Sequence, residues 1–136
     1  MIDIDVALRL RDAGLPWEPA DGDWFVIDAE LLRHEPFMLS SMVVERGEGR
    51  QGEPLFTFNG TTEWALDSIE PHEAIWLPRE DQLREALGQR FLGLCREVEG
   101  AFVVTARVGA GEEREIRAPH AEDAYAGALL VVLTAA

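Results

Sequence analysis

The sequence predicts a single α+β domain over residues 1–136, with a mostly antiparallel sheet of about five or six strands and three or four helices. Three observations support this class. Turn residues separate strand-like segments at 91–98, 101–108 and 114–118, and the middle segment has the period-two pattern of a half-buried strand, so a C-terminal antiparallel meander is expected. Seven apolar residues at helical spacing follow within 121–133, which predicts a last helix that packs on the sheet. At 136 residues, the chain is long enough to bury a core that needs no disulfides and no structural metal.

The strands and helices before the meander are predicted from local composition, helical spacing and capping residues. Four segments have the aromatic and β-branched composition of strands, the second being the least regular: 24–27, 37–45, 54–58 and 74–77. Three segments have helical spacing or a capping residue at the start: 4–13, which stops at Gly14, 62–69, which Thr61 or Thr62 caps, and 79–87, which follows Pro78. One or two helical turns are expected over 28–34, and an exposed glycine-rich turn over 46–52.

Charge is the clearest global property of the chain, which carries 26 acidic residues against 12 arginines and no lysine, a formal net charge of −14. Nucleic-acid binding is disfavoured because phosphate contacts need a basic face. The absence of lysine removes Schiff-base chemistry and the phosphate-binding lysine of nucleotide hydrolases. A solvated acidic surface is the simplest interpretation, and an acidic decoy that mimics nucleic acid is the alternative.

The N-terminal segment and the longest apolar run favour a cytoplasmic protein with no membrane partner. The first residues include two aspartates and lack the basic start of a secretory signal. The uncharged run 124–136 has thirteen residues, whereas a membrane-spanning helix needs about 20. Cys95, the single cysteine, lies in the apolar-leaning run 91–98, so we expect a buried and unreactive thiol there.

From residue 58 onward the sequence carries three segments that together resemble one protein family: FNGTTEWALDS at 58–68, WLPREDQL at 76–83 and AEDAYAGALL at 121–130. The chain is similar there to a family of small uncharacterised proteins from high-GC Gram-positive bacteria and related genomes. Some members resemble phage-borne proteins, and some carry a pilus-assembly label. Assembly ATPases have a phosphate-binding glycine-rich loop that ends in lysine, and this chain has neither. The resemblance implies a fold type and a bacterial setting, and leaves the activity open.

Sequence motifs give little support for catalysis, a metal or a cofactor. The three histidines lie far apart, and no pair has the spacing of metal ligands. Two local clusters combine a histidine with carboxylates: Glu70, His72 and Glu73, and His120, Glu122 and Asp123. In a chain with 26 carboxylates, such proximity is expected by chance. No serine or cysteine has the local signature of a nucleophile. We therefore predict no catalytic residue, no metal and no cofactor.

The four tryptophans, Trp17, Trp24, Trp64 and Trp76, are the strongest candidates for a binding surface. Most tryptophans lie in the core or at its edge, but an exposed pair rimmed by acidic residues would bind another protein. The predicted function is a small acidic non-enzymatic module that binds or regulates another protein, one with a basic surface, with a homodimer as a further option. The alternative is a small enzyme or ligand-binding domain that uses one of the histidine–carboxylate clusters. The predicted binding residues are Asn59, Thr62, Glu63, Trp64, Trp76, Glu80 and Asp81.

Overall fold

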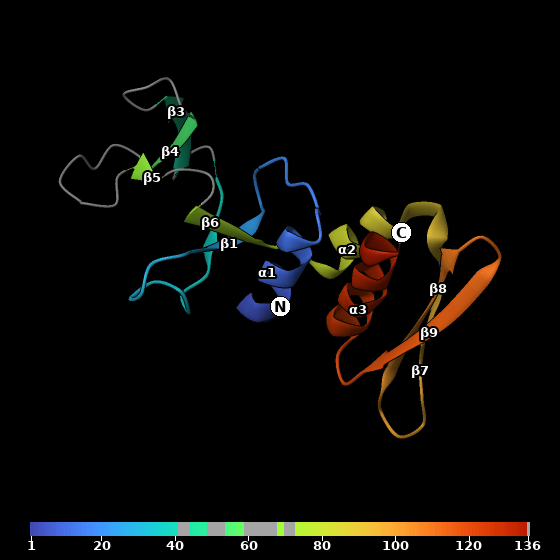
Figure 1. Cartoon of the computed structure of the whole chain (residues 1–136). Coiled ribbons are helices and arrows are strands. Elements are labelled where there is room, and N and C mark those ends of the chain that lie inside the picture. The colour runs from blue at the N-terminus through green and yellow to red at the C-terminus, as the bar shows by residue number, and fades with distance from the viewer. Residues whose placement is uncertain (41–43, 49–53, 59–67, 70–72, 136) are drawn as a thin grey trace. The chain divides into compact units, whose positions relative to one another are not determined.

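The computed structural model describes residues 1–40, 44–48, 54–58, 68–69 and 73–135. For 44–48, 54–58 and 68–69 it describes the backbone alone. The chain divides into two compact units: unit 1, Met1–Pro16 with Pro78–Ala136, and unit 2, Trp17–Leu77. Three α-helices and nine strands, all paired antiparallel, occur in the described residues (Figure 1). The predicted α+β class and the antiparallel pairing are confirmed, whereas the strand count is higher than predicted. That the chain is a single domain stays a prediction.

The predicted C-terminal meander forms the sheet of unit 1. Its strands are β7 (Phe91–Arg96), β8 (Phe102–Gly109) and β9 (Glu112–Ala118), in the order β7-β8-β9. The two turns contain Gly100 and Gly111, whose φ angles of 98° and 78° suit glycine. Alternation along β8 buries Val104, Ala106 and Val108, as the period-two pattern predicts, and Val103 is buried as well.

Helix α3 (Ala121–Thr134) packs on one face of this sheet, as predicted (Figure 1). The face is the one that holds Val104 and Ile116, which lie directly opposite each other on β8 and β9. Small residues let the helix come close: a Cβ added at Gly127 would lie 2.8 Å from Cγ2 of Ile116. The buried residues of the helix, which form its contact with the sheet and with the other helices of unit 1, are Ala124, Tyr125, Ala126, Ala128 and Leu129.

Replacing Gly127 with Ala is expected to destabilise unit 1 by up to about 2 kcal/mol, even though alanine is the better helix former by about 1 kcal/mol. The new methyl group would overlap Ile116, a β-branched residue that cannot easily turn aside. Urea unfolding, followed by far-UV circular dichroism, measures the change. Gly93→Ala is the control because its added Cβ meets nothing within 4 Å. A gain in stability for Gly127→Ala would contradict the close approach of α3 to β9.

Two further helices of unit 1 pack against α3. They are α1 (Ile4–Asp12) and α2 (Glu80–Leu87), and a short 3-10 helix, η2 (Gly88–Arg90), connects α2 to β7. Each α-helix buries two residues along one side: Ala7 and Leu10 in α1, Leu83 and Leu87 in α2. These helices confirm the predicted segments at 4–13 and 79–87. None of the helices in the described part of the chain has the length and apolarity that crossing a membrane requires.

Unit 2 contains two small sheets. In the first, β1 (Trp24–Ile27) lies between β2 (Phe37–Met38) and β6 (Ala74–Leu77). Its core consists of Phe25, Ile27, Leu39 and Ala74, against which partly buried side chains pack. In the second sheet, β4 (Pro54–Phe58) lies between β3 (Val44–Glu48) and β5 (Ser68–Ile69). The strands predicted at 24–27, 54–58 and 74–77 are confirmed with the same bounds.

Two local predictions in unit 2 are corrected. Strand β3 runs through Arg46, Gly47 and Glu48, which pair with β4, so the glycine-rich segment 46–52 is not a turn throughout. The helix expected to run to Ile69 is wrong at that end, because Ser68–Ile69 pairs with β4 as strand β5. The remainder of that helix, 62–67, lies outside the described residues. Segment 28–34, where one or two helical turns were predicted, forms turns that include one i→i−4 hydrogen bond, from Arg33 N to Ala29 O, which is a single helical turn.

Candidate functional site

The structure describes three of the seven predicted binding residues. Asn59, Thr62, Glu63 and Trp64 lie outside the described residues. Trp76 lies in β6 of unit 2, whereas Glu80 and Asp81 are exposed in the first turn of α2 in unit 1. The predicted grouping of these side chains into one surface therefore stays a prediction.

Trp76 belongs to an aromatic cluster that the sequence did not indicate. Its ring stacks on that of Trp17, with centroids 6.0 Å apart and planes 4° from parallel, and Trp17 also contacts Phe25 at 6.3 Å. Both tryptophans are half-buried. The Nε1 atom of Trp76 is buried and has no hydrogen-bond partner within the described structure. Trp17 and Trp76 therefore form the core edge of unit 2, and they are not an exposed pair.

A buried carboxylate holds the loop that carries Trp17. Asp23 is 3% exposed, and its Oδ2 atom accepts hydrogen bonds from Trp17 Nε1 at 2.9 Å and from the backbone N–H of Ala20 at 3.0 Å. The backbone of the same loop is bonded to Leu39, which donates to Asp23 O at 2.7 Å. Buried carboxylates need such partners because burial of an unpaired charge is costly. We therefore assign Asp23 a structural role, which is to hold the loop through these two hydrogen bonds.

Glu80 and Asp81 have a local role at the start of α2. Asp81 pairs with Arg79, Oδ1 to Nε at 3.1 Å, and both acids lie near the positive end of the helix dipole. Arg79 N donates to Gln82 Oε1 at 2.9 Å, half of a capping box. These contacts give the start of α2 a local capping arrangement, and the predicted binding role of Glu80 and Asp81 stays a prediction.

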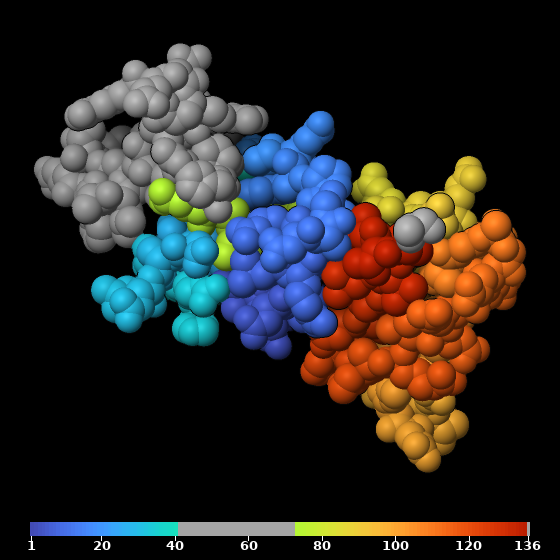
Figure 2. All heavy atoms as spheres, viewed as in Figure 1, coloured from blue at the N-terminus to red at the C-terminus, as the bar shows by residue number. Residues whose placement is uncertain are grey.

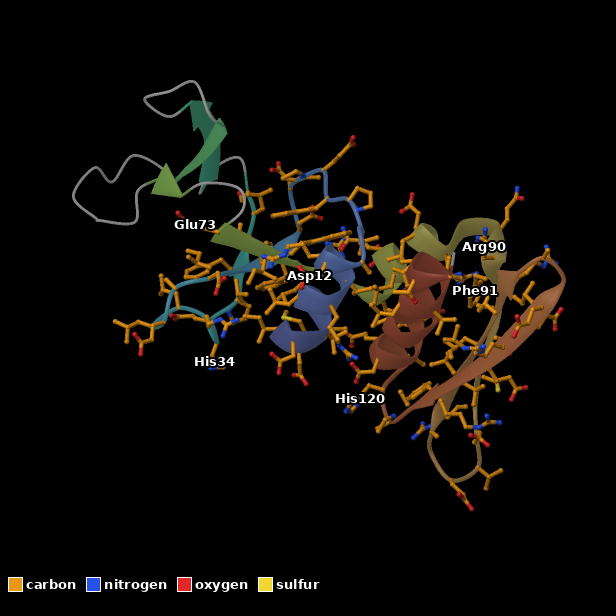
Figure 3. All side chains as sticks on the ribbon, viewed as in Figure 1. Asp12, His34, Glu73, Arg90, Phe91 and His120 are labelled. Carbon is orange, nitrogen blue, oxygen red and sulfur yellow. The ribbon has the colours of Figure 1, made fainter. Side chains whose placement is uncertain are left out.

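The histidines of the described residues do not assemble a chemical site. His34 is exposed in the turns after β1, and His120 is exposed at the N-cap of α3 (Figure 3). Glu122 pairs with the α-amino group of Met1 at 2.6 Å. No group of three or more metal-ligating side chains occurs in the described part of the chain. The predicted cluster at 70–73 lies outside it except for Glu73.

Strand β7 and the turn after it expose large apolar side chains that the core of unit 1 does not cover. Of the six large hydrophobic side chains that are exposed in the described residues, three lie within 92–98: Leu92 at 41%, Leu94 at 38% and Val98, which is fully exposed. We call these three residues the apolar strip. Leu92 sits at a register shift between β7 and β8, whereas Leu94 lies opposite Val104. The turn that carries Val98 projects beyond α3 (Figure 2).

The same strand is an edge of its sheet. Within the described residues β7 pairs with β8 alone, so one side of its backbone has no strand beside it. Edge strands present unpaired N–H and C=O groups and are usually protected by charge, by bulges or by a covering element. The register shift at Leu92 is one such device, but residues 93–96 pair regularly with β8. The register shift therefore does not interrupt this half of the edge.

Cys95 lies in this edge, which overturns the prediction of a buried thiol. The residue is exposed. It lies opposite Val103 and so points to the face of the sheet that α3 does not cover. The apolar neighbours of Cys95 suggested burial, but a strand at the edge of a sheet with one covered face leaves such side chains in solvent.

Three arginines surround the apolar strip without a carboxylate partner. Arg84 lies over the Phe91 ring, 4.6 Å from its centroid, and Arg96 lies over Phe102 at 5.4 Å. Arg90 donates from Nη1 to the backbone O of Arg107 at 3.4 Å and stands at the start of β7 (Figure 3). All three are exposed, and in the described residues no acidic oxygen lies within 4 Å of their charged groups.

Arg117, on the other face of the sheet, shows the contrast. Its Nη2 lies 2.8 Å from Glu115 Oε2 and its Nε lies 3.0 Å from Glu97 Oε1. The hydrogen bond to Glu115 is the largest cause of a raised Arg117 pKa, and the charge of Glu97 comes next. Glu97, the acid nearest in sequence to Arg96, is therefore already engaged.

Comparisons of the chain with protein-family models, with curated proteins and with solved structures found no match. The family resemblance of segments 58–68, 76–83 and 121–130 accordingly stays a prediction. The candidate site thus depends on the geometry of β7 alone.

Proposed function

We propose that this chain is a small acidic, non-enzymatic protein-binding module, and that it binds an extended segment of another protein along the edge strand β7. The observation that carries the proposal is the apolar strip: Leu92 and Leu94 are exposed on a strand whose outer backbone has no neighbour in the described residues, and Val98 is exposed in the turn that follows it. Exposed apolar side chains that gather in one part of a folded domain mark a candidate interaction site.

Strand addition would use both properties of β7. The partner's backbone would continue the antiparallel sheet through main-chain hydrogen bonds, which supply affinity with little dependence on sequence. Side chains of the partner that lie beside Leu92 and Leu94 would supply the selectivity. A six-residue edge offers a small contact area, so we expect a transient complex and not an obligate one.

The alternative from the sequence, a small enzyme or ligand-binding domain with a histidine–carboxylate cluster, has no comparable support among the described residues. His34 and His120 are exposed, and Glu122 is paired with the α-amino group of Met1.

The net charge of −14 predicts a partner with a basic surface, and this prediction concerns the chain as a whole. The charge is uneven, because unit 2 has 13 acidic residues against 3 arginines and unit 1 has 13 against 9.

The test selects twelve-residue peptides from a random displayed library on the immobilised full-length protein, then titrates the selected peptides into the ¹⁵N-labelled protein. We expect the amide shifts to concentrate in residues 91–98 and the facing part of β8. Changing both Leu92 and Leu94 to Ser should weaken binding by at least about tenfold, since each leucine would contribute roughly 1 kcal/mol of apolar burial. Circular dichroism verifies that the variant is folded.

The matched control changes two exposed apolar residues of unit 2, Leu31 and Met38, to Ser. This variant loses more exposed apolar surface than the β7 variant, because Leu31 is 93% exposed, and its affinity for the selected peptides should still equal that of the parent. Shifts centred on the Trp17–Trp76 cluster, or equal affinities for both double variants, would show that β7 is not the binding strand.

A further inference from the structure

We infer that the segment bound by β7 is itself acidic: an extended, alternating apolar strand of another protein with a carboxylate at each end of the part that pairs. This inference rests on the proposed function and specifies its partner. It assigns to Arg90 and Arg96 the recognition of those two carboxylates, with Arg84 beside Arg90's end of the strand.

Local charge is the basis of the inference. The chain as a whole has more than two acidic residues for each arginine, yet residues 88–96 contain Arg90 and Arg96 and no acid. Elsewhere in the described residues, most arginines form an ion pair with a carboxylate. Examples are Arg33, Arg79, Arg114 and Arg117. The three arginines beside the apolar strip are held instead by rings or by a backbone oxygen. Their charges remain available to an outside group.

The placement of the charges defines the length of the partner segment. Arg90 ends η2 immediately before β7, and Arg96 is the last residue of β7. The extended part from Phe91 to Arg96 corresponds to about 17 Å, with Arg90 one residue beyond it. Leu92 and Leu94 lie between them. A complementary segment therefore has acidic residues six positions apart with apolar side chains in between.

A second copy of this chain fits the edge less well. When two β7 strands pair antiparallel in one continuous sheet, the register that centres on Gly93 brings Arg96 of one copy to the end of the other strand, where Arg90 immediately precedes β7. Like charges directly opposite each other are destabilising. Charge complementarity favours an acidic foreign segment.

The experiment uses three seven-residue peptides, acetylated and amidated, with the common core Thr-Val-Thr-Val-Thr and both ends as Asp, Ser or Lys. Each is titrated into the ¹⁵N-labelled full-length protein at low salt, and β7 amide shifts give the affinity. The Asp peptide should bind about three- to tenfold more tightly than the Ser peptide, and the Lys peptide most weakly. High salt should remove the advantage of the Asp peptide.

Changing Arg90 and Arg96 to Gln should reduce the Asp-over-Ser preference to less than about twofold and leave the Ser peptide's affinity unchanged. The matched control, Arg9→Gln with Arg114→Gln, alters the net charge equally on exposed residues of α1 and β9, and should keep the preference.

The outcomes separate the two proposals. Equal binding of all three peptides at β7 overturns the acidic partner and leaves strand addition standing, and tighter binding of the Lys peptide does the same in favour of a basic partner. Failure of every peptide, including those selected from the library, to shift β7 overturns both. A concentration-dependent dimer that Leu92→Ser with Leu94→Ser converts to monomer would identify a second copy as the occupant and overturn the acidic segment.

Discussion

Replacing Leu129 with Asp is expected to lower the unfolding free energy of unit 1 by about 3–5 kcal/mol, a large part of the 5–15 kcal/mol that stabilises a domain. Leu129 is 1% exposed in α3, which packs on β8 and β9. The change removes a buried aliphatic side chain and introduces a carboxylate with no partner for its charge. Urea midpoints from far-UV circular dichroism measure the loss.

Val98→Asp is the matched control for this change, because it introduces the same carboxylate at a fully exposed apolar residue of unit 1. Its effect should be within about 0.5 kcal/mol. If the two variants unfold at the same urea concentration, α3 is not docked on the sheet, and its apolar side serves a partner instead.

The second large effect is expected at Asp23. Replacing it with Ala should destabilise unit 2 by about 2–3 kcal/mol, because Trp17 Nε1 and the backbone N–H of Ala20 lose the acceptor they share. Trp17 stacks on Trp76, so the loss should extend to the aromatic cluster. Tryptophan fluorescence during urea unfolding reports on this unit, which contains all four tryptophans.

Asp21→Ala provides the comparison, since Asp21 is an exposed aspartate two residues away in the same loop. Its removal should change stability by less than about 0.5 kcal/mol. A midpoint for Asp23→Ala that matches that of Asp21→Ala would mean that the buried carboxylate does not hold the loop.

Unit 1 was largely predictable because its local and tertiary preferences agree. The alternation along β8 and the helical spacing of α3 are visible in sequence, and each surface is the natural cover for the other. Strand β5 was not predictable. Its two residues gain strand geometry only by pairing with β4, while the capping threonines before them favour a helix.

The candidate site could be predicted only in part. Which strand lies at an edge depends on strand order, so the exposure of Cys95 and Leu94 could not be inferred from their apolar neighbours. The stacking of Trp17 on Trp76 joins residues far apart in the chain. One signal was present: residues 88–96 hold two arginines and no acid within a strongly acidic sequence.

Hydrogen exchange of the β7 amides tests the central claim most directly. In an antiparallel edge strand, alternate N–H groups point away from the sheet, so about half of the β7 amides should exchange rapidly in the free protein while the amides bonded to β8 are protected. Adding a peptide selected on the protein should slow the rapidly exchanging set. Amides already protected in the free protein at high dilution, or unchanged in the saturated complex, would contradict strand addition at β7.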